Sequence, residues 1–299
     1  MDTGTLWSAQ IQGIWTLYAS RLLRFDARYD AWYRPLLDLD GARQILEIGC
    51  GPGALAGALC RMYPEAAVTG IDRDRDFVSF AKAHVPRVDF LTGDATALPF
   101  PDDSFDATVS HTVSEHVETD AFFGEQYRVL RDGGICVVLS SRRGFSVPAP
   151  CLAMTETEKW FWDRLEPLPD PAAEYIARYP LDAQELPLAM EKYGFRDVRS
   201  GYVTIALTPD DPGTPADMAH AIIDEERYCM CEAVEAAKRK YPLVVTEEET
   251  AAVLSAIAEK FDRRVRQYDS GKRIWDTAVS VIQIVRGVKR WYDNTEKAQ

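Results

Sequence analysis

The feature that most constrains this chain is an apolar strand that runs into a glycine-rich turn, Ile45-Leu46-Glu47-Ile48-Gly49-Cys50-Gly51-Pro52-Gly53. Glycine at every second position allows a tight turn and lets a ligand approach the backbone where a Cβ would collide. A helix is expected to begin near Gly53, so that its free N–H groups point into the same space. The pattern predicts a nucleotide-type cofactor site at the end of a parallel strand.

Two cofactors fit this turn. The spacing Gly49-x-Gly51-x-x-Ala54 matches the loose dinucleotide fingerprint, and Glu47-x-Gly49-x-Gly51-x-Gly53 suits S-adenosylmethionine (SAM). Asp72 ends a predicted strand at 67–71, about 20 residues after the turn, and suits ribose hydroxyls in both cases. Asp94 ends the next predicted strand, where an oxygen can accept from an adenine amino group. A dehydrogenase has no special need for this second acid, so SAM is favoured over a nicotinamide cofactor.

The amino-acid composition limits the classes of substrate that the protein can bind and the compartment in which we expect it. The net charge of −13 argues against a nucleic-acid substrate, because phosphate binding needs an excess of Lys and Arg. The six cysteines lack zinc-site spacing, so we expect free thiols and no metal. No apolar stretch approaches the roughly 18 residues that span a bilayer, and the N-terminus does not resemble a signal peptide. We therefore expect a cytoplasmic protein with no membrane partner.

Two further motifs complete a family pattern: Pro99-Phe100-Pro101-Asp102-Asp103-Ser104-Phe105-Asp106 and Arg128-Val129-Leu130-Arg131-Asp132-Gly133-Gly134. With the glycine turn and the two strand-end acids, they make residues 40–140 resemble the class I SAM-dependent methyltransferases. The resemblance implies an α/β fold with a doubly wound, seven-stranded, mostly parallel sheet. Its last strand, predicted at 274–285, would run antiparallel beside the fifth.

The same resemblance implies the cofactor contacts. The methionine part of SAM would be surrounded by Glu47, Gly49, Cys50, Gly51 and Gly53. Asp72 would bind the ribose with Arg73 beside it, Asp94 and Ala95 would flank the adenine, and His111 would close the pocket. An N-terminal helix would act as a lid that directs Tyr18, Arg21 and Arg24 at the cofactor. The alternative is a helix that only packs on the core.

The pattern of predicted strands, helices and proline-rich stretches divides the chain into five parts. We expect N-terminal lid helices over 1–40, the SAM-binding core over 41–140, and an insertion with a helix and the sixth strand over 141–210. A helical cap is expected over 211–272, and the last strand and tail over 273–299, with the chain frayed after Trp291. Because ligands of open α/β sheets bind at the carboxyl ends of the strands, the inserted helices are expected to cover that crevice.

Methyl transfer from a sulfonium needs alignment, and it needs a base only when the acceptor must lose a proton. Glu115 and His116 follow the fourth predicted strand and are the candidate catalytic residues. The alternative is that one of them caps the next helix or orients a SAM contact.

The acceptor is predicted from side chains outside the core. Aromatic side chains there favour a small aromatic or heteroaromatic specialised metabolite, such as an indole, methylated at carbon or a heteroatom. These side chains are Trp7, Trp15, Tyr18, Phe145, Trp160, Phe161, Trp162, Tyr175, Tyr179 and Tyr228. A quinone or lipid precursor is the alternative acceptor. From other classes come a nicotinamide oxidoreductase and a catalytically silent SAM-binding regulator. The oligomeric state is not predicted.

Overall fold

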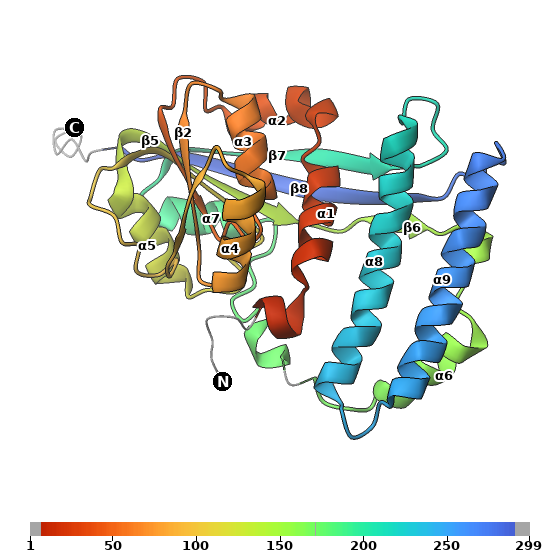
Figure 1. The fold of residues 1–299 in the computed structure, drawn as a ribbon. Helices are drawn as coiled ribbons and strands as arrows, with labels where there is room; N and C mark the ends of the chain where they lie inside the picture. Colours follow the sequence, from red (N-terminus) through yellow and green to blue (C-terminus); the bar gives the residue numbers. More distant parts are fainter. Residues whose placement is uncertain (1–6, 171, 291–299) are drawn as a thin grey trace, which may run out of the picture. The chain divides into compact units, whose positions relative to one another are not determined.

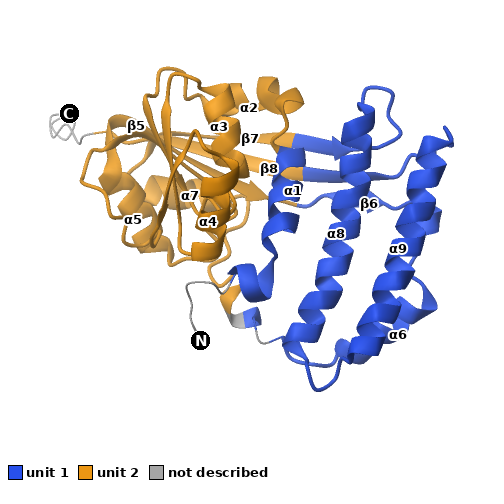
Figure 2. Cartoon of the chain, viewed as in Figure 1, with its two compact units in different colours: residues 1–24, 143–174, 204–280 blue, residues 25–142, 175–203, 281–299 orange. Residues whose placement is uncertain are grey.

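The structure is a computed structural model that describes residues 7–170 and 172–290 (Figure 1). The tail after Trp291, which was expected to fray, lies outside the described residues. The chain divides into two compact units (Figure 2). The core unit contains residues 25–142, 175–203 and 281–299, and the helical unit contains residues 1–24, 143–174 and 204–280. Each unit is therefore assembled from three separate stretches of sequence.

The structure is built around one β-sheet. Its strands in the described chain are β1 (Gln44–Ile48), β2 (Ala67–Asp72), β3 (Asp89–Thr92), β4 (Phe105–His111), β5 (Leu130–Ser141), β6 (Phe145–Val147), β7 (Arg196–Leu207) and β8 (Thr277–Val288). Their order is β3-β2-β1-β4-β5-β8-β6, with β7 also paired to β8. The first five strands are parallel, and β8 is antiparallel to β5. The doubly wound, mostly parallel sheet is confirmed.

The strand count differs from the prediction, because the described part of the chain contributes eight strands to the sheet rather than seven. The additional strand, β6, pairs with residues 277–279 of β8, while β5 pairs with residues 282–288 of the same strand. Between β5 and β6, Gly144 passes so close to Val279 that an added Cβ would collide with the Val279 carbonyl oxygen. A glycine at this position therefore lets the chain continue along β8 after β5 has ended.

The core unit contains five α-helices in the described chain, and local capping residues help to set where they begin. These helices are α2 (Asp30–Leu37), α3 (Ala54–Met62), α4 (Arg75–His84), α5 (Thr119–Val129) and α7 (Glu185–Lys192). The Asp74 side chain caps α4 by accepting from the N–H groups of Asp76 and Phe77. Strand β1 is buried along Ile45, Leu46 and Ile48, as expected for the centre of a sheet covered on both faces.

The N-terminal segment is not one helix. It forms a π-helical turn (Trp7–Ile11), α1 (Ile14–Arg24), a 3-10 turn (Ala27–Tyr29) and then α2. The break falls at Asp26, whose carboxylate accepts from the Arg28 N–H at 3.0 Å and caps the 3-10 turn. The helices expected over residues 1–40 are therefore separated by a local capping bond, which apolar spacing does not register.

The helical unit contains α1, α6 (Glu156–Leu165), α8 (Ala216–Lys240) and α9 (Glu247–Asp269). Helix α9 opens on a capping box: Thr246 N–H donates to Glu249 Oε2 at 2.9 Å, and Glu249 N–H donates to Thr246 Oγ1 at 3.2 Å. No helix in the described chain has the length and apolar composition required to span a bilayer. The expected covering of the crevice by these helices stays a prediction.

The predicted last strand begins later than expected, at Thr277 instead of Ile274. The N–H groups of Ile274 and Trp275 donate to Asp210 Oδ2 at 2.7 and 2.9 Å, so they are not available to a sheet partner. Asp210 is itself paired with Arg264, which is completely buried and also bonds Asp276. A long-range buried ion group therefore sets the start of β8.

Candidate active site

The glycine turn joins β1 to α3 and is fixed to the end of β2. The N–H groups of Gly49 and Cys50 both donate to the carbonyl oxygen of Ile71, at 2.8 and 3.0 Å. The three glycines all have positive φ: Gly49, Gly51 and Gly53. A Cβ on Gly49 would also collide with the side chain of Val113. The turn therefore needs glycine for its backbone conformation and for its close packing.

The N–H groups of the glycine turn are bonded within the protein, and the first turn of α3 supplies the backbone donors beside a buried carboxylate. Helix α3 has Gly53 as its N-cap, without a side-chain cap or an acidic residue in its first turn, so the positive end of the helix is open to an anion. Glu47, at the end of β1, is 2% exposed. Burial, with the charges of Asp72 and Glu47, raises the pKa of the Cys50 thiol, which is therefore neutral. This set of donors and acceptors fits a zwitterionic group such as the methionine part of SAM.

Asp72 lies where a ribose acid is expected. Its Oδ2 accepts from the Gly51 N–H at 2.8 Å and its Oδ1 accepts from the Asp74 N–H at 2.8 Å. Burial raises the pKa of this carboxyl to about 6, although both hydrogen bonds act in the opposite direction. Arg73 is exposed next to it. The carboxylate is thus part of the glycine turn as well as a candidate ligand contact.

Asp94 and Ala95 lie one strand further along the sheet edge. Because β2 and β3 are parallel and Asp72 is in register with Thr92, the two acids follow the carboxyl ends of adjacent strands. Asp94 Oδ1 accepts from Thr96, from the backbone N–H at 2.8 Å and from the hydroxyl at 2.7 Å. Asp94 is exposed, and Ala95 packs against the core cluster of the sheet. The predicted pair of strand-end acids is thus brought together at one edge.

His111 ends β4 and is 7% exposed. Its ring meets Phe25 edge to face, with ring centroids 5.0 Å apart and an interplanar angle of 86°. This contact fixes the ring within the core unit. A direct contact between His111 and the cofactor stays a prediction.

A segment that sequence reasoning did not connect to the site binds Glu115 and His116. The Ala177 N–H donates to His116 Nδ1 at 2.9 Å, and the Tyr179 N–H donates to the Glu115 carbonyl oxygen at 2.9 Å. Arg142, at the end of β5, holds the same segment by donating to the Leu181 carbonyl oxygen at 2.9 Å. No short-range sequence signal connects residues 175–182 to this loop, because the partners are about 60 residues apart in the chain.

This arrangement separates the roles of the two candidates. Burial lowers the pKa of His116, and its Nδ1 lone pair is engaged by Ala177, so the neutral ring carries its proton on Nε2. In this tautomer His116 donates a hydrogen bond but does not accept a proton, which favours Glu115 as the base. Neither residue caps α5, because its N-cap is Glu118, whose carboxylate accepts from Asp120 and Ala121.

The proposed lid residues lie in the helical unit. Arg24 donates to the Ser20 carbonyl oxygen at 2.8 Å and lies 3.6 Å from the Glu225 carboxylate. Tyr18 meets Trp15 edge to face, with centroids 6.3 Å apart, and partial burial raises the pKa of its hydroxyl. Their expected contact with cofactor stays a prediction.

The aromatic residues proposed to line the acceptor site do not form one group. Phe161 is completely buried in the core of the helical unit, and Trp162 packs against the same cluster. Phe145, Trp160 and Tyr228 are each more than half exposed. The sequence pattern did not distinguish core rings from surface rings, since both occur on amphipathic helices.

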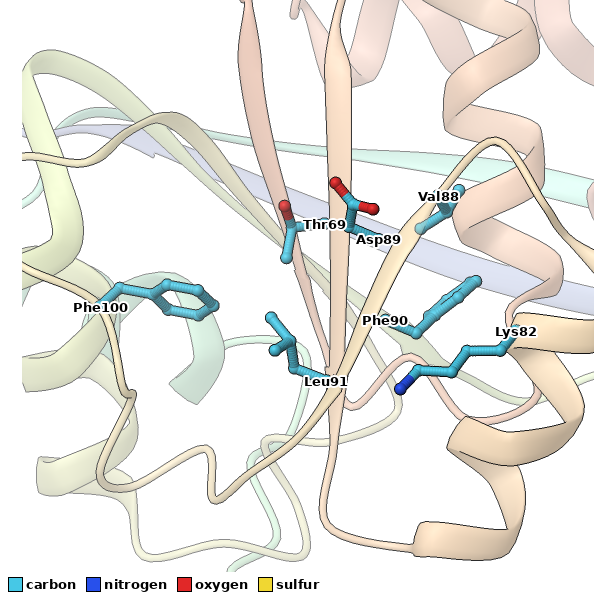
Figure 3. Close-up of a pocket in the computed structure, with 7 residues that line it drawn as sticks. All are labelled: Thr69, Lys82, Val88, Asp89, Phe90, Leu91 and Phe100. Atoms are coloured by element: carbon cyan, nitrogen blue, oxygen red, sulfur yellow. The ribbon is translucent and has the colours of Figure 1, made fainter.

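A pocket of about 600 Å³ lies along the edge strand β3 (Figure 3). Its lining residues are Thr69, Lys82, Val88, Asp89, Phe90, Leu91 and Phe100. None of them belongs to the glycine turn or is one of the two strand-end acids. The cofactor chemistry therefore lies elsewhere, at the carboxyl ends of the strands.

Comparison with known proteins agrees with this geometry. Residues 46–138 match the family model described as a methyltransferase domain, and these residues span the turn and both acids. Residues 46–138 therefore form a methyltransferase domain of the class I SAM-dependent type. The cofactor of this methyltransferase domain is SAM, as expected from its donors and acceptors.

Curated relatives match over the same region. A fatty-acid O-methyltransferase of Mycolicibacterium smegmatis is 38% identical over 115 residues, which cover 37% of this chain and 41% of the relative. A ubiquinone/menaquinone biosynthesis C-methyltransferase of Desulfotalea psychrophila is 36% identical over 104 residues, covering 34% of this chain and 42% of the relative. The match to this methyltransferase domain thus spans about two fifths of each relative's length.

Among solved structures, phosphoethanolamine N-methyltransferase 2 of Haemonchus contortus matches with a TM-score of 0.53 at 18% identity. The match covers 97% of this chain and 61% of the other. At this identity the likeness concerns the fold.

Proposed function

We propose that this protein transfers the methyl group of SAM to a small hydrophobic acceptor of the lipid or quinone-precursor type. The observation that carries the proposal is the juxtaposition of the glycine turn with Asp72 and Asp94 at the carboxyl ends of three neighbouring strands. The match of this region to methyltransferases supports the reaction class.

Each part of the cofactor has a complementary group in the chain. The open N-terminus of α3 suits the carboxylate of the methionine part, and buried Glu47 suits its ammonium group. Asp72 accepts from ribose hydroxyls through the lone pairs that Gly51 and Asp74 leave available. Asp94 accepts from the adenine amino group, with Ala95 against the ring.

The chemical step depends on alignment. When bound, SAM supplies a methyl group activated by a positive sulfonium sulfur, and its loss leaves S-adenosylhomocysteine. The loop after β4 holds Glu115 for an acceptor proton and His116 as a neutral donor that orients an acceptor oxygen. Residues 175–182 keep this loop in place through Ala177 and Tyr179.

The proposed acceptor class differs from our first preference, an indole-like metabolite. Relatives at 36–38% identity are named for fatty acids, for ubiquinone or menaquinone biosynthesis, and for phthiotriol and phenolphthiotriol dimycocerosates. Part of the aromatic set that suggested a flat ring is core packing in the helical unit. Both observations favour the lipid or quinone alternative.

The test is incubation of the complete chain with methyl-labelled SAM and a panel of fatty acids, hydroxylated quinone precursors, phenols, indoles and amines. We expect label in the lipid or quinone products, and less label with the Asp72→Ala variant at SAM concentrations that do not saturate it. Label found only in indoles would contradict the proposed lipid or quinone acceptor and support an aromatic one. SAM binding without transfer to any of these acceptors would favour the silent regulator and contradict the proposal.

A further inference from the structure

The loop between β3 and β4 carries Asp94, but local bonds alone do not fix its position. Within residues 93–97, here called the adenine-side turn, Thr96 donates to Asp94 Oδ1 and the Ala97 N–H donates to the Asp94 carbonyl oxygen at 3.2 Å. These bonds set the shape of the turn. Its first residue is anchored, because the Gly93 N–H donates to the Asp72 carbonyl oxygen at 2.9 Å.

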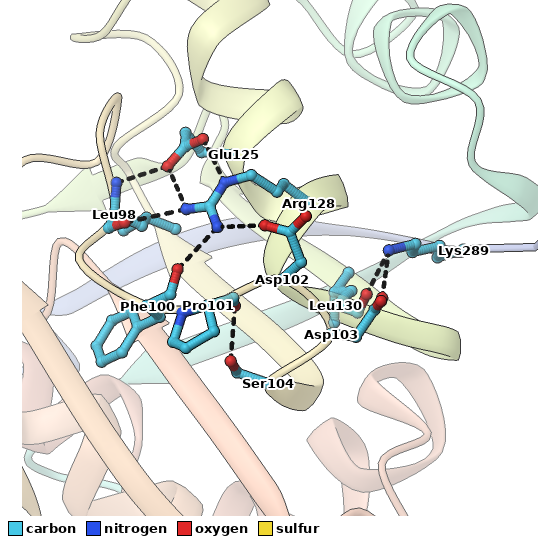
Figure 4. Close-up of polar contacts among 10 residues, drawn as sticks. All are labelled: Leu98, Phe100, Pro101, Asp102, Asp103, Ser104, Glu125, Arg128, Leu130 and Lys289. Atoms are coloured by element: carbon cyan, nitrogen blue, oxygen red, sulfur yellow. Dashed lines mark hydrogen bonds and ion pairs between the residues drawn. The ribbon is translucent and has the colours of Figure 1, made fainter.

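The other end of the turn is held by two residues of α5 (Figure 4). The Leu98 N–H donates to Glu125 Oε2 at 2.6 Å, and the Leu98 carbonyl oxygen accepts from Arg128 Nη2 at 3.0 Å. Arg128 Nη1 also donates to the Phe100 carbonyl oxygen at 2.7 Å and to Asp102 Oδ1 at 2.9 Å. Both backbone groups next to the adenine-side turn are therefore bound by one ion pair.

The ion pair is itself well positioned. Arg128 Nε and Nη2 donate to the two carboxylate oxygens of Glu125, each at 2.8 Å, in the bidentate geometry that favours rigid contacts. The Arg128 guanidinium holds the pKa of Glu125 below its usual range, so the pair is ionised at neutral pH. Phe122 and Phe123 of the same helix are completely buried, which fixes α5 against the sheet.

We propose that Arg128 and Glu125 are positioning residues for the adenine-side turn and thereby set the preference of the site for adenine. The proposal rests on the proposed function, in which Asp94 accepts from the adenine amino group. Neither residue touches the cofactor in this account. They act by keeping Leu98, and through it Asp94, at a fixed distance from Asp72.

Base chemistry supplies a readout that general destabilisation would not change. Adenine presents an amino donor to Asp94, whereas hypoxanthine presents a carbonyl oxygen that repels a carboxylate. A correctly placed Asp94 therefore favours the adenine form. A displaced turn binds both forms with similar affinity, because the contacts to ribose and methionine remain.

The experiment measures the dissociation constants of S-adenosylhomocysteine and its hypoxanthine analogue for the complete chain by calorimetry. In Arg128→Met and Glu125→Gln, we expect the preference for the adenine form to fall by about two- to tenfold, the value of one hydrogen bond. Arg164→Met is the matched control. It removes another bidentate pair, to Glu249, with nearly the same exposure, 30% and 21% against 30% and 20% for Arg128 and Glu125.

The control should keep the wild-type preference. Folded Arg128→Met or Glu125→Gln proteins that also keep it would overturn the proposal. If Arg128→Met does not fold, Arg128→Lys replaces it, because lysine keeps the positive charge but loses the bidentate guanidinium geometry. The preference for the adenine form in Arg128→Lys and Glu125→Gln is then compared with that of the wild type. A wild-type chain that binds neither compound would overturn the proposed function, and this result is distinct from binding without discrimination.

Discussion

At the scale of single residues, Asp72 combines two demands in one carboxylate. It accepts N–H groups from Gly51 and Asp74 and has a pKa raised to about 6 by burial. In the proposed complex, the ionised form accepts from the ribose hydroxyls, so bound cofactor would stabilise the carboxylate. Protonation of Asp72 near pH 6 would then lower the affinity for SAM.

We predict that SAM affinity is constant above about pH 7 and falls as the pH decreases through 6, by up to about tenfold per pH unit. The sign follows because protonation of the free site competes with binding. Calorimetry from pH 5 to 8 measures the effect, with Asp72→Asn as the control that removes this titration. An affinity that does not change over this range would show that the carboxylate is not the ribose acceptor.

Glu115 and His116 give a second prediction at this scale. Glu115→Gln should lower the single-turnover rate of methyl transfer by about 10²–10⁴ if the acceptor must lose a proton, with SAM affinity nearly unchanged. His116→Asn keeps a donor group and should cost less. His111 variants should instead weaken SAM binding. Wild-type rates in both the Glu115 and the His116 variants would mean that alignment alone carries the reaction.

At the scale of elements, the prediction succeeded where the signal is local and repeated. The strand–turn–helix around residues 45–62 was readable because glycine spacing and apolar runs are short-range features. The antiparallel last strand beside β5 followed from the resemblance of residues 40–140 to a known family. The start of β8 and the ties from Arg142 to residues 181 and 182 were not readable, since they depend on contacts between distant segments.

Gly144 offers a test of the unpredicted strand β6. Gly144→Ala should lower the free energy of unfolding by about 1–3 kcal/mol, because its Cβ would collide with the Val279 carbonyl oxygen. Gly124→Ala is the control, since nothing lies within 4 Å of its added Cβ and it sits in α5. That variant should gain about 0.5–1 kcal/mol. Chemical denaturation measures both, and equal stability of the two variants would contradict the account of β6.

At the scale of the whole molecule, the two units, each built from three stretches of sequence, differ in the polar groups that they bury. The core unit buries mainly apolar side chains with isolated polar groups such as Glu47 and Gln283. The helical unit buries complete ion pairs, Arg264 with Asp210 and Asp276, and Lys260 with Glu158. Composition could not reveal this difference, because charged residues on amphipathic helices usually face solvent. The cofactor chemistry was predictable from residues 40–140, while the acceptor depends on segments without a comparable motif.

The most direct test of the central claim, that the core is a SAM site, is calorimetric titration of the complete chain with SAM and, separately, with NAD. We predict saturable SAM binding, no NAD binding, and a loss of about 1–3 kcal/mol in the Asp72→Ala variant, which leaves ribose hydroxyls unpaired. Tight NAD binding without SAM binding would contradict the account.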